Sequence, residues 1–191
     1  MLTREKLYSL EEYHRIRPKF RAKVIALKKI RTVPVGPNAS LHFENELTMH
    51  YQVQEMVRLE RMYEPEKIQE ELDVYNPLIP DGSNWKATLM IEFPDAEERK
   101  QALARLKGFE KSVWAQVGGA AKIHPIANED LDRETGEKTS AVHFLRFELT
   151  PDMVAAAHAG APIRVGADHP AYRAEVLLPP DTRESLVSDL A

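Results

Sequence analysis

The chain has 191 residues, of which 43% are hydrophobic and 29% are charged, and its formal net charge is -4. This length and composition predict one folded domain of ordinary size, while the acidic balance argues against a general attraction to nucleic acid. The chain has no cysteine, which excludes disulfides, thiolate-bound zinc and cysteine-ligated iron–sulfur clusters, so a metal site would have to use His, Asp and Glu.

The sequence shows no pattern that directs a protein to a membrane. No apolar run reaches the ~18 residues that a membrane-spanning helix needs. The first residues carry charges that no apolar segment follows, which is not the pattern of a signal peptide. We therefore expect a cytoplasmic protein that does not contact membranes.

The first part of the chain is predicted to be mainly helical. Ser9 and Glu12 form a capping box that begins a helix, and Pro18 suits the first position of a second helix that ends near Arg31. After a connection rich in proline and glycine, another helix is expected over about residues 47–62.

The segment 15–31 is strongly basic. It contains eight Lys and Arg residues and no acidic one: Arg15, Arg17, Lys19, Arg21, Lys23, Lys28, Lys29 and Arg31. One interpretation is a patch that binds nucleic acid or another anion. The alternative is that the acidic helices that follow neutralise it within the molecule, and the net charge favours this alternative, so that nucleic-acid binding is not expected.

The helix over 47–62 carries the densest run of functional groups. At roughly 100° per residue one face is apolar, with Met49, Val53, Met56 and Val57 on it, and Glu60 falls near the centre of that face. A carboxylate there needs a partner, because an unpaired buried charge is costly. The candidate polar site consists of Glu44, Gln52, Glu55, Glu60 and, from the second half of the chain, Arg146. The alternative is an amphipathic helix whose polar residues only cap, pair and solvate it.

Residues 76–82 contain two prolines and a glycine and mark the best internal boundary, between a helical part, 1–80, and a sheet part, 81–191. The sheet part is predicted to run β-α-β-β-α-β, which is the ferredoxin-like order, with the strands around Met90 and Phe144 in one sheet. The predicted fold class is therefore α+β, with the N-terminal helices packed on an antiparallel or mixed sheet, and the two parts are expected to form one compact unit.

Two histidines of the sheet part are candidate metal ligands. His143 lies in the middle of a strand whose two faces are largely apolar, and His169 precedes Pro170, which favours an extended backbone. Together with Glu55 they would supply one carboxylate and two imidazoles for iron, manganese or zinc. No local metal motif supports this set, and the alternative is that each histidine is a core residue bonded to backbone.

Several blocks of the sequence resemble a known family. They are residues 43–45, 48, 52–61, 75–80, 140–144 and 168–172, and together they resemble the bacterial domain-of-unknown-function family 3501 over nearly the whole chain. The resemblance implies a small cytoplasmic protein. It also implies, through genes that often lie nearby, a role around rubrerythrin-like or iron–sulfur oxidoreductases.

Three hypotheses follow, and the sequence names no reaction. The first is a protein that binds a divalent metal through Glu55, His143 and His169 and acts in redox or iron-related stress. The second is a non-enzymatic accessory protein that docks through its N-terminal helices on an iron–sulfur or rubrerythrin-type oxidoreductase. The third is nucleic-acid binding through the basic segment 15–31.

Overall fold

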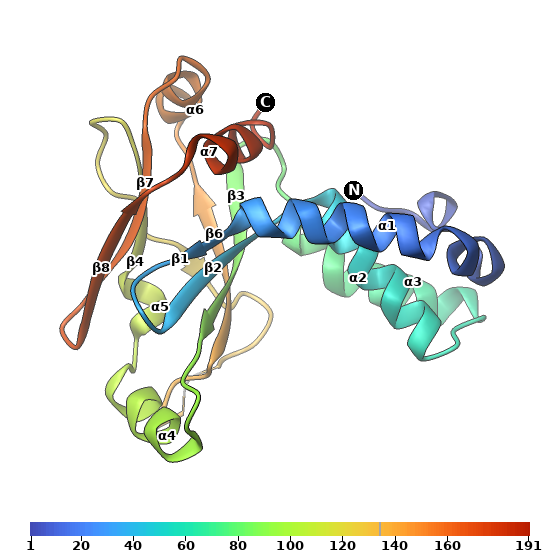
Figure 1. Ribbon diagram of the computed structural model, residues 1–191, viewed down its shortest axis with the longest axis horizontal. Coiled ribbons are helices and arrows are strands. Elements are labelled where there is room, and N and C mark those ends of the chain that lie inside the picture. Colours follow the sequence, from blue (N-terminus) through green and yellow to red (C-terminus); the bar gives the residue numbers. More distant parts are fainter. Residues whose placement is uncertain (134) are drawn as a thin grey trace.

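The computed structural model describes residues 1–133 and 135–191, and Figure 1 shows a body of β-strands from which an arm of helices projects. Within those residues the α-helices are α1 (Leu10–Arg31), α2 (Glu46–Leu59), α3 (Pro65–Tyr75), α4 (Ala96–Arg105), α5 (Phe109–Ser112), α6 (Pro151–His158) and α7 (Pro180–Val187). Two short 3-10 helices are η1 (Arg4–Lys6) and η2 (Asn76–Leu78). The strands are β1 (Thr32–Pro34), β2 (Ala39–Glu44), β3 (Asn84–Ile91), β4 (Val113–Val117), β5 (Ile126–Ala127), β6 (Val142–Glu148), β7 (Ile163–His169) and β8 (Tyr172–Leu177).

Helix α1 is one continuous helix of 22 residues rather than the two predicted helices. It begins as predicted, because the Ser9 side chain accepts a hydrogen bond from the backbone N–H of Glu12 at 3.2 Å. Pro18 lies inside the helix, where it removes one backbone hydrogen bond. The continuous helix offsets that loss, since it buries Tyr13 on one side of Pro18 and Val24 on the other.

Two antiparallel sheets form the body. Among the described residues the larger sheet has the strand order β1-β2-β3-β6-β5, and the smaller has the order β4-β7-β8. Strands β3 and β6 pair directly, with Thr88 opposite Phe144 and Met90 opposite Val142. The strands around Met90 and Phe144 therefore share one sheet, as predicted.

The α+β class is confirmed, but a single sheet of ferredoxin-like order is not. Strands β4, β7 and β8 leave the expected sheet and form the second one. Both sheets turn an apolar face inward, and Trp85 and Phe147 of the larger sheet share one core with Ile163 and Val165 of the smaller. When the two sheets stack, the apolar face of each sheet covers that of the other. In a single sheet, helices alone would have to cover the apolar face.

The N-terminal part contributes strands as well as helices. Each of the six residues of β2, from Ala39 to Glu44, pairs with β3, and β1 pairs with β2 on its other side. Residues 32–44 therefore belong to the larger sheet, although they lie before the predicted boundary at residue 80. The helices on either side of them, in contrast, lead away from it.

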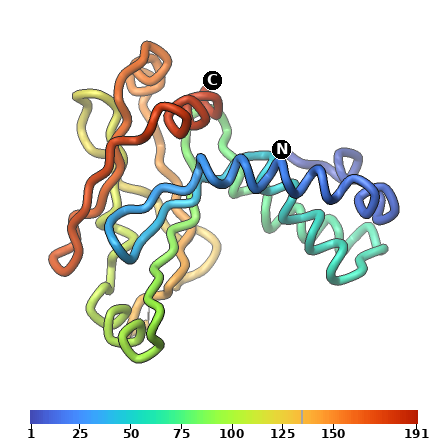
Figure 2. Tube along the Cα trace, viewed as in Figure 1, coloured from blue at the N-terminus to red at the C-terminus, as the bar shows by residue number. Residues whose placement is uncertain are grey.

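Helices α1, α2 and α3 form the arm, which extends away from the sheets instead of packing on them (Figures 1 and 2). The arm has its own buried apolar cluster, made of Leu2, Met49, Val53, Val57 and Leu72, which is distinct from the core of the body. The C-terminal end of α1 contacts β1, β2 and α7 in the body. The molecule thus has two cores, and the chain segments at the junction of arm and body connect them.

Candidate functional site: the arm and its junction with the sheets

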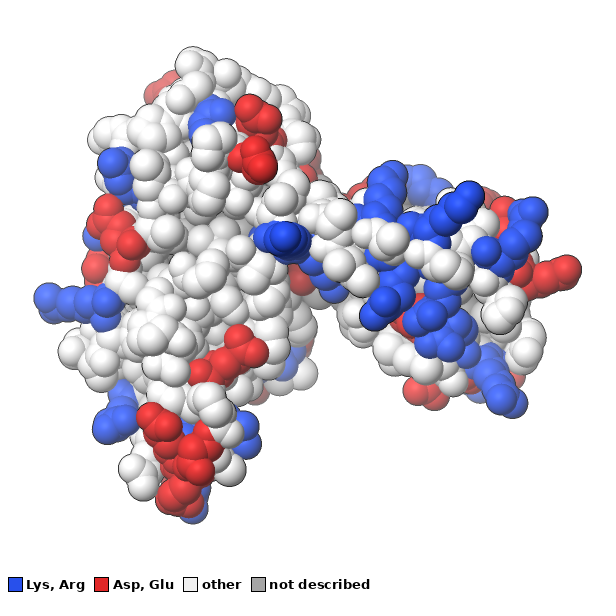
Figure 3. Space-filling view, viewed as in Figure 1, with Lys and Arg blue, Asp and Glu red and all other residues white. Residues whose placement is uncertain are grey.

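The exposed residues of α1 are strongly basic, and Figure 3 shows Lys and Arg gathered over the arm. Six cations are exposed: Arg15, Lys19, Arg21, Lys23, Lys28 and Lys29. None of the six forms an ion pair with residues 1–133 or 135–191, whereas Arg17 pairs with Glu55 and Arg31 pairs with Asp189. The expected neutralisation by the following acidic helices is therefore limited to the Arg17–Glu55 pair, and most of the basic charge faces solvent.

Glu55, on α2, is the centre of the contacts that hold α1 and α2 together. Arg17 donates to its two oxygens at 2.7 and 2.9 Å, and Arg58 donates at 3.3 and 3.0 Å. The hydroxyl of Tyr13 donates at 2.8 Å. The hydrogen bonds from Arg17, followed by those from Arg58 and Tyr13, lower the pKa of Glu55 to about 2 in spite of its burial. Glu55 is therefore an ionised group that is already occupied by intramolecular donors.

Two other predicted polar residues of α2 lie apart from this cluster. The Gln52 amide contacts the Tyr75 hydroxyl of α3 at 3.5 Å. Glu60 is the C-cap of α2 and is exposed, so its predicted position at the centre of a buried face is wrong. Val57 is the last residue of α2 that packs in the buried apolar cluster of the arm. The residues after it, Leu59 and Glu60, are exposed.

Glu44 lies at the end of β2 and is largely buried. Its carboxylate accepts hydrogen bonds from the Thr48 hydroxyl at 2.7 Å and from the Thr88 hydroxyl at 3.0 Å. Thr48 and Asn45 also form the capping box that begins α2. Glu44 therefore ties the larger sheet to the first turn of α2, and it does not share a site with Glu55.

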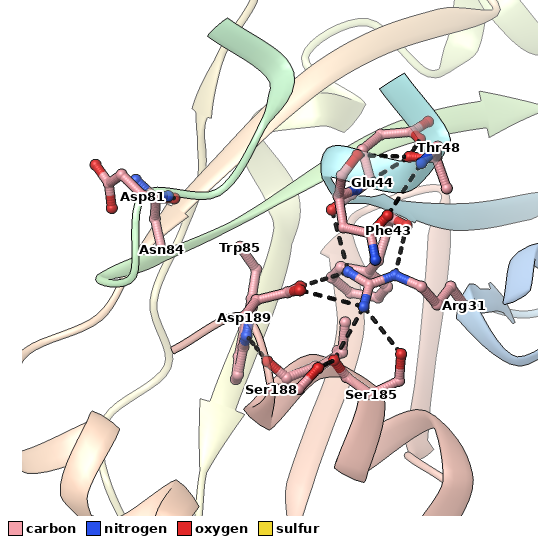
Figure 4. A network of polar contacts seen from close by, with 12 residues as sticks. Arg31, Phe43, Glu44, Thr48, Asp81, Asn84, Trp85, Ser185, Ser188 and Asp189 are labelled. Atoms are coloured by element: carbon pink, nitrogen blue, oxygen red, sulfur yellow. Dashed lines mark hydrogen bonds and ion pairs between the residues drawn. The ribbon is translucent and has the colours of Figure 1, made fainter. Parts of the chain in front are cut away.

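The guanidinium of Arg31 joins the arm to the body, as Figure 4 shows. Arg31 is 1% exposed and donates to the backbone carbonyl oxygens of Phe43 and Glu44 at 2.9 and 3.1 Å. It also donates to the carbonyl and hydroxyl oxygens of Ser185, in α7, at 3.0 and 2.9 Å, and it forms an ion pair with Asp189. Burial raises the pKa of Asp189, and the Arg31 charge acts against that rise. The several N–H donors of this one guanidinium thus hold the end of α1 against both β2 and α7.

His143 is fully buried near the start of β6. The Asn128 side chain accepts from the backbone N–H of Phe144 at 3.3 Å, so its amide nitrogen faces the ring and donates to Nδ1 at 2.9 Å. Nε2 then carries the proton and lies 3.0 Å from the carbonyl oxygen of Ser140 and 3.0 Å from the Thr139 hydroxyl. His143 is thus a hydrogen-bonded core residue, which is the alternative that the sequence left open.

His169 ends β7 and is also used by the backbone. Its Nε2 lies 3.0 Å from the carbonyl oxygen of Lys107, and its Nδ1 accepts from the backbone N–H of Ala171 at 3.1 Å. The ring contacts Phe109 edge to face, with centroids 6.0 Å apart. Both ring nitrogens therefore have partners within the body.

The structure does not bring the three predicted metal ligands together. Glu55 is bound by side chains of the arm, whereas His143 and His169 bond to separate segments of the body. No group of three or more His, Asp and Glu side chains that could hold a metal ion occurs in the described ranges 1–133 and 135–191. The physical reason is that hydrogen bonds inside the protein occupy the atoms that would bind the ion.

Arg146, the last residue of the predicted polar site, lies on the outer face of the larger sheet and not inside an apolar layer. It donates to Glu129 at 2.8 and 2.7 Å and forms an ion pair with Glu148. These hydrogen bonds, with Glu129 first, raise the pKa of Arg146 further above its ordinary value. Arg146 is therefore a paired surface arginine, remote from the Glu55 cluster.

The pattern of charges in the sequence did not reveal the separate roles of Arg17 and Arg31, which differ from those of their basic neighbours. For Arg17 a local signal existed, because it lies four residues after Tyr13 and so shares a face of α1 with it. For Arg31 no local signal existed, because its acidic partner Asp189 lies 158 residues later in the chain.

Comparison with known proteins agrees with this structure. The family model described as "Protein of unknown function (DUF3501)" matches residues 1–190. A crystal structure at 1.90 Å, described as a novel protein of unknown function from Burkholderia pseudomallei K96243, is 49% identical, with a TM-score of 0.93 over 100% of this chain and 99% of that chain. No curated protein gives a significant match. No helix within the described residues has the length and apolar character needed to cross a membrane.

Proposed function

The chain belongs to the DUF3501 family, and we propose from its structure that it is a non-enzymatic accessory protein that docks through its arm on the acidic surface of a partner protein. The partner in this proposal is an iron–sulfur or rubrerythrin-type oxidoreductase, the class that the family resemblance implies. The iron chemistry would then reside in the partner, since this chain has no cysteine to ligate a cluster.

The proposal rests on the difference between the paired and the unpaired cations of α1. Two arginines of α1 form ion pairs within the protein, Arg17 with Glu55 and Arg31 with Asp189. These pairs fix the helix in place. The six exposed cations of α1 have no such partner in the part of the chain that the structure describes. A rigid basic helix on a chain of net charge -4 favours an acidic protein surface, because complementary charge speeds association and sets orientation.

The second candidate ligand of this basic helix is nucleic acid. The positions of the aromatic residues of α1 argue against binding to single strands. Single-stranded nucleic acid needs exposed aromatic side chains for base stacking. Tyr13 is fully buried, and Phe20 packs edge to face on Tyr8, with ring centroids 6.0 Å apart. Neither aromatic side chain of α1 stands free in solvent, because Tyr13 is buried and Phe20 is half-buried against other rings.

Site-specific cross-linking tests the proposal. A photoreactive amino acid replaces Lys23, which is exposed on α1, and in a matched control it replaces Lys100, which is exposed on α4 in the body. We expect adducts with one acidic oxidoreductase from position 23 and none from position 100. The variant with Lys19→Glu and Lys23→Glu should lower the association rate of the purified pair by about 10-fold at low salt and less at physiological salt.

The same experiment separates the alternatives. Adducts with nucleic acid alone from position 23 would favour the second candidate. Equal adduct patterns from positions 23 and 100, or an association rate that does not respond to charge reversal, would overturn docking through the arm.

A further inference from the structure

A cavity of about 540 Å³ lies in the corner between the arm and the outer face of the larger sheet. Its apolar lining comes from the end of α3, from η2, from β6 and from the segment before residue 134, and includes Val74, Tyr75, Pro77, Leu78, Leu131 and Phe144. The volume falls in the ~300–1,000 Å³ range of small-molecule sites. Val74 and Leu131 are 62% and 54% exposed, so the cavity has an apolar rim that is open to solvent.

Two cations meet at the floor of this cavity. Lys86 of β3 lies directly opposite Arg146 of β6 in the strand register. Like charges in opposite positions of a sheet repel each other unless each is neutralised. Arg146 is neutralised, because it pairs with Glu129 and Glu148. Lys86, in contrast, forms no ion pair with the residues that the structure describes.

Lys86 finds no carboxylate in the part of the chain that the structure describes. Its ammonium donates to the carbonyl oxygen of Pro77 at 2.9 Å. The carboxylate on the neighbouring strand at the same level, that of Glu44, is committed to Thr48 and Thr88. Burial, and next the charge of Arg146, lower the pKa of Lys86, while the charges of Glu129, Asp81 and Glu148 act against this shift.

Each of the other charged groups of the cavity has at least one hydrogen-bonding partner. Arg133 forms an ion pair with Asp130 and lies over the ring of Phe144, 4.7 Å from its centroid. Asp73, at the rim, accepts from the Gln69 amide at 2.8 Å. The cavity thus combines an apolar wall with one half-buried ammonium that uses one of its three donor positions.

We propose that this cavity binds an amphipathic organic anion, a small molecule with an apolar body and one carboxylate or sulfonate group. The anionic group binds the Nζ atom of Lys86, and the apolar body packs on Phe144 and Leu78. Such a ligand bridges the arm and the body. The inference is independent of the proposed docking function, because no residue of α1 lines the cavity.

Fluorescence titration of the full chain with two related probes tests the proposal. Anilinonaphthalene sulfonate carries an anionic group, and phenylnaphthylamine has the same kind of aromatic body without charge. We expect one molecule of the sulfonate per chain, bound about 10-fold more tightly than the neutral probe. Decanoate should displace the sulfonate, and decanol, its uncharged counterpart, should not do so at the same concentration.

Variants of Lys86 assign the site. Lys86→Met should weaken sulfonate binding by about 10-fold and leave the neutral probe nearly unchanged, whereas Lys86→Arg should retain sulfonate binding. Lys100→Met, in α4, is the control and should behave as the wild type. In the wild-type protein, the bound sulfonate should slow chemical acetylation of Lys86, and not of Lys100, in mass spectrometry. The acetylation experiment decides the question even if Lys86→Met does not fold.

Three results would overturn the proposal. They are equal affinity for the charged and neutral probes, sulfonate binding that Lys86→Met leaves unchanged, and acetylation of Lys86 that the probe does not slow.

Discussion

Arg17 and Glu55 form a two-point ion pair between α1 and α2, in which Nε and Nη2 of the arginine lie 2.7 and 2.9 Å from the two carboxylate oxygens. The residues lie 38 positions apart in the chain. A bidentate pair fixes orientation as well as distance. The basic face of α1 is therefore held in a defined position relative to the rest of the arm.

Replacing Glu55 with Gln should destabilise the arm. We expect the free energy of unfolding to fall by about 1–3 kcal/mol, because Arg17 and Arg58 lose a charged acceptor. Urea denaturation at neutral pH, followed by circular dichroism, measures the change. Glu60→Gln is the matched control, since Glu60 is an exposed carboxylate at the end of the same helix. An equal loss in both variants would contradict a special role for Glu55.

The contribution of Glu55 should depend on pH in acid. Its pKa is about 2 in the folded protein, against an ordinary value of 4.5. Because the folded value is the lower one, the stabilisation is complete above the ordinary pKa and is lost as the pH falls toward 2. The stability difference between wild type and Glu55→Gln should therefore shrink below about pH 4.5. A difference that stays constant from neutral pH down to pH 3 would refute this explanation.

Replacing Arg31 with Met should be more damaging than any change on the exposed face of α1. The substitution leaves the buried carboxylate of Asp189 without its cation, and we expect a loss of about 3–5 kcal/mol in unfolding free energy at neutral pH. Lys29→Met, two residues earlier and exposed, is the control. Because burial already raises the pKa of Asp189, the variant should recover part of the loss as the pH falls and this carboxyl takes up a proton.

His143→Ala should act on stability. The substitution leaves a cavity at a fully buried position and removes the partner of the Asn128 amide, so we expect a loss of about 2–4 kcal/mol. Elemental analysis of untagged protein should show the same metal content in the wild type, His143→Ala and His169→Ala. Loss of a stoichiometric metal from both variants would instead restore the predicted metal site.

Nucleic-acid binding should remain weak. The chain is net negative and its basic helix exposes no stacking aromatic, so we expect no DNA complex tighter than the ~10⁻⁴–10⁻⁶ M of non-specific contacts at physiological salt. Fluorescence anisotropy with a labelled duplex and a labelled single strand measures this. A submicromolar complex at that salt would refute the prediction and shift the function of α1 toward nucleic acid.

Features that depend on residues a few positions apart could be predicted from the sequence. The helix start at Ser9, whose side chain accepts from the backbone N–H of Glu12 at 3.2 Å, is confirmed. That the strands around Met90 and Phe144 lie in one sheet also followed from the order of predicted elements. A capping bond is local, and strand periodicity is a property of the strand alone, so both can be recognised without knowing the fold.

The covering of each apolar face and the neutralisation of each charge depend on contacts between distant parts of the chain, which became known with the fold. Periodicity marks a face of β4 or β7 as apolar, yet it cannot tell whether a helix or a second sheet will cover that face. The hydrophobic effect has no direction, so either cover removes the same apolar surface from water. The pairing of Arg31 with Asp189 spans 158 residues, and it selects one arginine of a basic run for the core while its neighbours remain in solvent. His143 was recognisable as a polar residue in an apolar strand, but the partner of its Nδ1 atom, Asn128, belongs to a separate segment that no spacing in the sequence connects to it.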